Sequence, residues 1–135
     1  MSVKILSVAK QLPKHTRETK DIIPFVKLWM QGQETRFQRK VLKLFEGAGV
    51  DRRYSIMDAE EVFLNSSFED KNKIYVREVT TLAEQSLKKS LEKASLQPTD
   101  IDYIITVSCT GIMIPSVDAY LINSLQMRHV SFANY

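Results

Sequence analysis

The sequence predicts an α/β fold in which helices pack in layers against a sheet. Two observations lead to this prediction. Apolar residues recur every three to four positions from about Asn72 to Ala94, which predicts one long amphipathic helix. The segment from Asp102 to Asp118 then has the pattern of a strand, a sharp turn and the start of a helix. With the segments upstream, the expected order is strand, helix, helix, long helix, strand, helix.

Two elements are expected at the N-terminal end. The segment from Val3 to Ala9 alternates enough between polar and apolar side chains for a first strand, which Pro13 ends. A helix is then expected through Ile22 to Trp29, where apolar residues have helical spacing. Thr16 or Thr19 is the expected N-terminal cap of this helix.

A second helix is expected from Glu34 to Glu46, with Gly47 as a left-handed C-terminal cap. On a helical wheel its cations form one stripe, which consists of Arg36, Arg39, Lys40 and Lys43. Each like-charged pair one turn apart costs roughly 0.2–0.5 kcal/mol on an isolated helix. The residues alone leave two interpretations open: a solvated basic face, which is the commoner case, or an edge that binds phosphate.

The strand after the long helix is expected at Tyr103 to Val107, a β-branched and aromatic run, and Ser116 offers a cap for the helix that follows. Asp118 would lie in the first turn of that helix, where a carboxylate interacts favourably with the helix dipole. Pockets of α/β proteins lie where a strand ends and a helix begins. The sequence therefore predicts a pocket at this tip. Three small polar side chains stand there: Ser108, Cys109 and Thr110.

Composition narrows the class of protein. The 135 residues suffice for one domain or part of one. With 44% hydrophobic and 26% charged residues, the chain has the composition of a globular protein, not of a disordered or collagen-like one. No apolar run reaches the roughly 18 residues that a membrane span needs, and the apolar N-terminal stretch is too short for a secretory signal. We therefore expect a cytoplasmic protein without a membrane span.

The single cysteine excludes an internal disulfide, and its spacing from the two histidines matches no zinc motif. Cys109 has two interpretations. A thiol at a strand end near a helix start is a candidate nucleophile. Neither His15 nor His129 has a sequence-based claim to reach it, however, which favours a small buried apolar side chain.

One block of residues resembles a known family. Val107 to Asn123, preceded by Ile74-Tyr-Val-Arg-Glu78 and Leu96-Gln-Pro-Thr-Asp-Ile-Asp102, is similar to the N-terminal part of a type III polyketide synthase, with bacterial members the more similar. These enzymes form the chalcone synthase-like family of the thiolase superfamily. The resemblance implies a thiolase-like layered α-β-α fold, of which this chain holds the N-terminal portion only. Residues 1–127 would form the incomplete N-terminal domain and residues 128–135 a divergent tail.

The resemblance also implies a site for coenzyme A. Members of this family hold the phosphates of coenzyme A with basic residues on the helix before an Arg-Arg-Tyr segment. Arg36, Arg39 and Lys43 match these positions through the shared Arg-Phe-Gln-Arg pattern. This match favours the phosphate-binding interpretation of the basic stripe, because arginine and lysine suit charge-assisted contacts to phosphate.

Three further positions match residues around the family's substrate cavity. Cys109 and Thr110 match residues that line the cavity for the starter and the growing polyketide, which makes Cys109 a pocket wall. Ile114 matches the residue that crosses the dimer interface into the cavity of the partner subunit. The family's nucleophilic cysteine, histidine and asparagine match no residue of this chain, so we expect no catalytic residue in it.

The function implied is that of an acyltransferase, which condenses malonyl-CoA with an acyl-CoA starter by decarboxylative Claisen chemistry. We expect coenzyme A thioesters as substrates, no further cofactor, no metal, a homodimeric parent protein and an isolated chain that is inactive. Two other functions stay open: a non-catalytic remnant that acts as a dimerisation or interaction module, and a basic domain that binds a polyanion such as RNA. The chain lacks the interleaved aromatic residues of single-strand binders, so we expect no nucleic acid partner.

Overall fold

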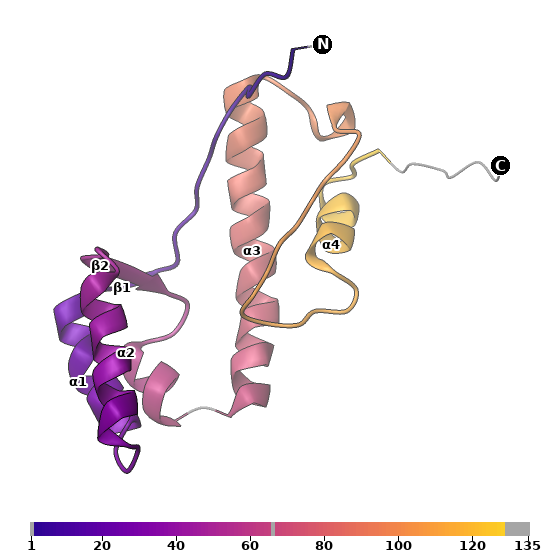
Figure 1. Ribbon diagram of the computed structural model, residues 1–135. Helices are drawn as coiled ribbons and strands as arrows, with labels where there is room; N and C mark the ends of the chain where they lie inside the picture. The colour runs from indigo at the N-terminus through magenta and orange to yellow at the C-terminus, as the bar shows by residue number, and fades with distance from the viewer. Residues whose placement is uncertain (1, 66, 129–135) are drawn as a thin grey trace. The chain divides into compact units, whose positions relative to one another are not determined.

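The computed structural model describes residues 2–65 and 67–128 (Figure 1). The chain divides into two compact units. The hairpin unit consists of Pro13–Lys71, and the long-helix unit consists of Met1–Leu12 together with Asn72–Tyr135. Beyond Arg128, the tail expected over residues 128–135 lies outside the described residues.

The hairpin unit contains a two-stranded antiparallel sheet and three helical elements. In chain order they are β1 (His15–Glu18), α1 (Thr19–Trp29), α2 (Thr35–Gly47), β2 (Arg52–Ser55) and a π-helical turn (Glu61–Asn65). The register of the sheet places His15 opposite Ser55 and Glu18 opposite Arg52. Glu18 and Arg52 carry opposite charges, which favours this register because directly opposed side chains in a sheet interact.

The core of the hairpin unit lies along one face of α1. Ile22, Val26 and Met30 recur every four residues and are buried, and Val26 and Met30 have no exposed surface. Partly buried side chains from α2 and the π-helical turn complete the cluster; they are Val41, Leu42, Phe45 and Phe63. The helical spacing predicted Ile22 and Val26 correctly, but Trp29 is 52% exposed and Met30 is buried in its place.

The predicted caps of the first two helices were wrong. Glu18 precedes α1 without a capping hydrogen bond, Thr16 lies in β1, and Thr19 is the first helical residue. The Thr19 hydroxyl donates to the Val50 carbonyl instead, because the backbone before β2 runs beside it. Gly47 is the last residue of α2. The left-handed turn comes two residues later, at Gly49, where φ is +61°.

The long-helix unit contains most of α3 (Phe68–Ala94) and all of α4 (Val117–Ser124), which are joined by a hydrogen bond of 3.4 Å from the Tyr120 hydroxyl to the Glu84 carboxylate. As predicted, Ser116 precedes α4 and Asp118 lies in its first turn. The Thr106 hydroxyl lies 3.0 Å from a carboxylate oxygen of Asp118, which fastens the segment before the tip to the helix after it. No described helix is both long and apolar enough to cross a membrane.

Neither of the two strands that the sequence predicts in this unit is formed within the described residues. Val3–Ala9 and Tyr103–Val107 have no regular secondary structure, and the side chains of Val3 and Val107 are 97% and 92% exposed. A strand needs a neighbour to take up its backbone hydrogen bonds, and residues 2–65 and 67–128 supply none for these two segments. Side chains of α3 hold the first segment, since the Lys93 amine donates to the Val8 carbonyl over 3.1 Å.

Candidate functional site

The basic stripe lies on the exposed side of α2. Its four cations are all exposed, and none forms an ion pair or hydrogen bond with a residue in the described part of the chain. The other side of α2 packs on the core through Val41 and Phe45. Near the start of the helix, the Gln38 amide donates to the carbonyls of Met30 and Gln33 over 3.3 and 2.8 Å, which ties α2 to the turn before it.

The Arg-Arg-Tyr segment after the stripe is strand β2, and Arg53 joins it to both helices. The Arg53 guanidinium lies 4.9 Å from the centre of the Phe45 ring, a cation–π contact to α2. Its Nε donates to the Thr19 hydroxyl of α1 over 3.2 Å. The helix that carries the stripe is therefore fixed against the two-stranded sheet and α1 by packing and by this one arginine.

A second arginine contact joins β1 to the segment that follows β2. One amino group of Arg17 donates to both carboxylate oxygens of Asp58, over 3.0 and 2.9 Å. The hydrogen bond from Arg17, together with one from the Glu60 backbone N–H, lowers the pKa of Asp58 below its ordinary value. Asp58 therefore stays ionised to a lower pH than a free carboxyl group.

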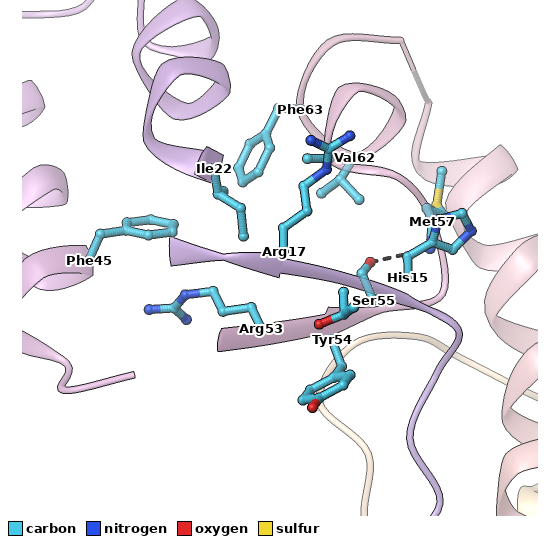
Figure 2. A pocket seen from close by; sticks show the side chains of 12 residues that line it. His15, Arg17, Ile22, Phe45, Arg53, Tyr54, Ser55, Met57, Val62 and Phe63 are labelled. Carbon is cyan, nitrogen blue, oxygen red and sulfur yellow. Dashed lines mark hydrogen bonds between the residues drawn. The ribbon is translucent and has the colours of Figure 1, made fainter. Parts of the chain in front are cut away.

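A cavity of about 250 Å³ lies within the hairpin unit. Figure 2 shows Ile22 and Phe63 on one side of it, Phe45 on another, and Arg17 and Arg53 rising from the two strands. Its lining is mostly apolar, and no residue of the basic stripe contributes to it. Sequence reasoning missed this cavity because its strands are four residues long and lack apolar alternation.

The predicted pocket residues belong to the long-helix unit. Cys109 and Thr110 are exposed at the tip between the extended segment and α4, and the side chain of Ile114 is 91% exposed. Asn72 and Tyr75 of α3 hold this tip by hydrogen bonds to Ile112 and Ser108. Neither residue of α3 was predicted to have a role, although Tyr75 lies within the Ile74-Tyr-Val-Arg-Glu78 block.

The structure thus divides the predicted site residues into two sets. It places Arg36, Arg39 and Lys43 together on one helix of the hairpin unit, and Cys109 and Thr110 together at the tip in the long-helix unit. Among residues 2–65 and 67–128, no group of three histidine, cysteine, aspartate or glutamate side chains is arranged to hold a metal ion. The first set is a group of exposed cations, and the second is a pair of exposed small side chains.

Comparison with known proteins gives a consistent set of relatives, although no family model matches the chain. The chain is 43% identical over 84 residues to 1,3,6,8-tetrahydroxynaphthalene synthase of Streptomyces coelicolor, which covers 62% of this chain and 22% of that protein. It is 31% identical over 85 residues to phloroglucinol synthase of Pseudomonas fluorescens, which covers 63% of this chain and 24% of that protein.

A solved structure supports the same relationship. The crystal structure of the Streptomyces coelicolor synthase, described as a bacterial type III polyketide synthase, matches with a TM-score of 0.75 and 30% identity. The match covers 90% of this chain and 35% of that one. It confirms the predicted α/β fold class. The chain spans only about a quarter to a third of the length of these relatives.

Proposed function

We propose that the chain is part of a type III polyketide synthase and that it supplies a coenzyme A-binding helix and one wall of an acyl cavity. The parent reaction is the decarboxylative condensation of malonyl-CoA with an acyl-CoA starter. In that reaction a cysteine thiolate takes the acyl group from its thioester. Malonyl-CoA loses carbon dioxide, and hydrogen-bond donors stabilise the enolate that attacks the acyl group. This chain contributes binding surface to the reaction and none of the reacting groups.

The observation that carries the proposal is the set of exposed cations on α2 that have no acidic partner in the described part of the chain. Coenzyme A carries a diphosphate and a 3′-phosphate. From Arg36 to Lys43 the helix rises about 10 Å, enough for contact with more than one phosphate group. The guanidinium groups of Arg36 and Arg39 can each donate two hydrogen bonds to one phosphate. Bound phosphate would also relieve the repulsion among the cations.

The test is binding of coenzyme A to the purified 135-residue chain, measured by calorimetry at low salt. A charge-assisted hydrogen bond contributes about 1.5–3 kcal/mol, so we expect Arg36→Gln and Arg39→Gln each to weaken binding about tenfold or more. Lys27→Gln on α1 is the matched control, because it also removes one exposed cation from the hairpin unit. Equal affinity of all these variants for coenzyme A would refute the proposal.

Dephospho-coenzyme A separates this site from non-specific attraction of anions. It lacks the 3′-phosphate, so a coenzyme A site should bind it more weakly. A polyanion-binding face would show little preference between the two ligands, and its affinity for RNA would fall steeply with salt. That outcome would favour the alternative of a basic polyanion-binding domain.

We also propose that the tip residues face the acyl chain and that Ile114 reaches a second subunit in the complete enzyme. The 91% exposure of Ile114 supports this, because such a large apolar side chain is available to a partner. If the surface is used in this way, Ile114→Asp should weaken self-association of the chain in sedimentation experiments. Unchanged association would contradict the role of Ile114 in a dimer.

A second candidate function is an interaction module without catalysis. The extended segments of the long-helix unit favour it, since they expose apolar side chains beside backbone that joins no sheet among residues 2–65 and 67–128; these side chains are Val3, Ile5, Tyr103 and Val107. Binding to a full-length relative without binding to coenzyme A would support this function over the first.

A further inference from the structure

The tip of the predicted pocket is fastened to α3 by one side-chain amide. The Asn72 amide nitrogen donates to the Ile112 carbonyl over 3.0 Å, and the Ile112 backbone N–H donates to the Asn72 amide oxygen over 2.8 Å. Both backbone groups of one residue are therefore satisfied by a single side chain. Two hydrogen bonds in opposite directions fix the position of Ile112 and the direction of its backbone.

Tyr75, one turn further along α3, holds the other side of the tip. Its side chain is buried, and its hydroxyl donates to the Ser108 hydroxyl over 2.6 Å. The backbone at Gly111 lies directly on the Tyr75 ring, because a Cβ atom added at Gly111 would come within 2.3 Å of two ring carbons. Only glycine allows this approach without moving the ring or the backbone.

Cys109 and Thr110 lie between these points of attachment. Both are exposed, and neither side chain has a hydrogen-bond partner within the described residues. Their positions are therefore set by their neighbours on each side: Ser108 before them, and Gly111 and Ile112 after them. The distance of the tip from α3 is set by the thickness of the Tyr75 ring.

We propose that Asn72 and Tyr75 are positioning residues for the acyl cavity. They hold Cys109 and Thr110 in one orientation toward the substrate, and the size of residue 75 sets how far this wall of the cavity stands from α3. This inference rests on the proposed function, because it takes the tip to be a cavity wall. Asn72 and Tyr75 act through the tip, because their side chains bond to Ile112 and Ser108.

A spin label on Cys109 tests this directly in the full 135-residue chain, since the chain has no other cysteine. We expect Asn72→Ala to narrow the lines of the nitroxide spectrum, because the tip moves more freely when its two hydrogen bonds are lost. Gln85→Ala is the matched control: it also removes an amide from the surface of α3, but from a residue with no partner in the described chain. We expect no change of the spectrum in this control.

Amide hydrogen exchange provides the second measurement, without a label. Loss of the bond from the Ile112 N–H should speed exchange at Ile112 at least about fivefold in Asn72→Ala. Asn72→Asp keeps an acceptor for this N–H and should restore most of the protection. Tyr75→Phe removes only the hydroxyl and should loosen the Ser108 side. Exchange at Leu121, within α4, should not change in any of these variants.

Two results would overturn the inference. One is an Asn72→Ala chain whose Ile112 exchange and spin-label spectrum match those of Gln85→Ala. The other is equal acceleration at Ile112 and Leu121, which would mean that Asn72 stabilises the whole unit and does not position the tip. Coenzyme A affinity tests the proposed function separately. A wild-type chain that fails to bind coenzyme A would refute that function while leaving the exchange result intact.

Discussion

Neutralising Arg39 should make the free chain more stable and coenzyme A binding weaker. Arg39 has one like-charged neighbour three residues before it, Arg36, and one four residues after it, Lys43. Each such pair costs about 0.2–0.5 kcal/mol, so Arg39→Gln should raise the free energy of unfolding by about 0.4–1 kcal/mol at low salt. No contact is lost in exchange, because Arg39 is exposed and unpaired among the described residues. Arginine and glutamine also have similar helix propensities.

The assay is urea unfolding of the full chain, followed by tryptophan fluorescence. Trp29 is the only tryptophan, and its ring centre lies 6.4 Å from that of Phe63 in the hairpin unit, so its signal reports the unit that contains α2. In 1 M salt the Debye length falls to about 3 Å, and the difference between variant and wild type should largely disappear.

Lys27→Gln gives the opposite expectation and serves as the control. Lys27 has no charged residue three or four positions away, and it lies in the last turn of α1, where a cation is favourable. Its removal should therefore leave stability unchanged or lower it slightly. If Arg39→Gln were no more stable than wild type at low salt, the stripe would not be a set of unbalanced charges. If Arg39→Gln were more stable but bound coenzyme A as well as wild type, the stripe would be only a solvated face.

Three further results are expected. Arg17 lowers the pKa of Asp58 in the folded chain, so the ionised carboxylate stabilises the fold fully above the unfolded carboxyl pKa of about 3.9. This stabilisation is lost as the pH falls through the lower folded pKa, and the unfolding free energies of wild type and Asp58→Asn should therefore converge in acid. A constant difference between these free energies down to pH 2 would contradict this. Gly111→Ala should destabilise the long-helix unit in wild type but much less in a Tyr75→Ala background, where the ring is gone; equal losses in both backgrounds would show that the ring is not the obstacle. The purified chain should release no free coenzyme A from malonyl-CoA, and turnover by the chain alone would overturn the division of roles proposed for it.

The helices could be predicted from the sequence because the information lies within each segment. Apolar spacing located α1, α2 and α3, and Ser116 and Asp118 marked the start of α4. The exposed stripe on α2 could also be predicted, since its charges share one side of a helix whose other side is apolar. These features depend on the periodicity within one helix and not on a second segment of the chain.

The strands could not be predicted in the same way. A strand requires a second segment for its hydrogen bonds, and Val3–Ala9 and Tyr103–Val107 have none within the described residues. The short β1 and β2 do pair, but their polar sequences give no alternating pattern to detect. The support of the tip was missed for a related reason: the contact of Asn72 with Ile112 joins residues 40 positions apart.

The two hydrogen bonds of Asn72 also determine whether Ile112 can pair with a strand. In an antiparallel ladder, a hydrogen-bonded pair of residues exchanges both N–H···O bonds. The Asn72 amide makes the same exchange with Ile112, so one residue of a helix takes the place of one residue of a neighbouring strand. A strand that paired with Ile112 through both backbone groups would first have to displace the amide. One side-chain amide of a helix therefore occupies both backbone groups of Ile112, as a residue of a neighbouring strand would.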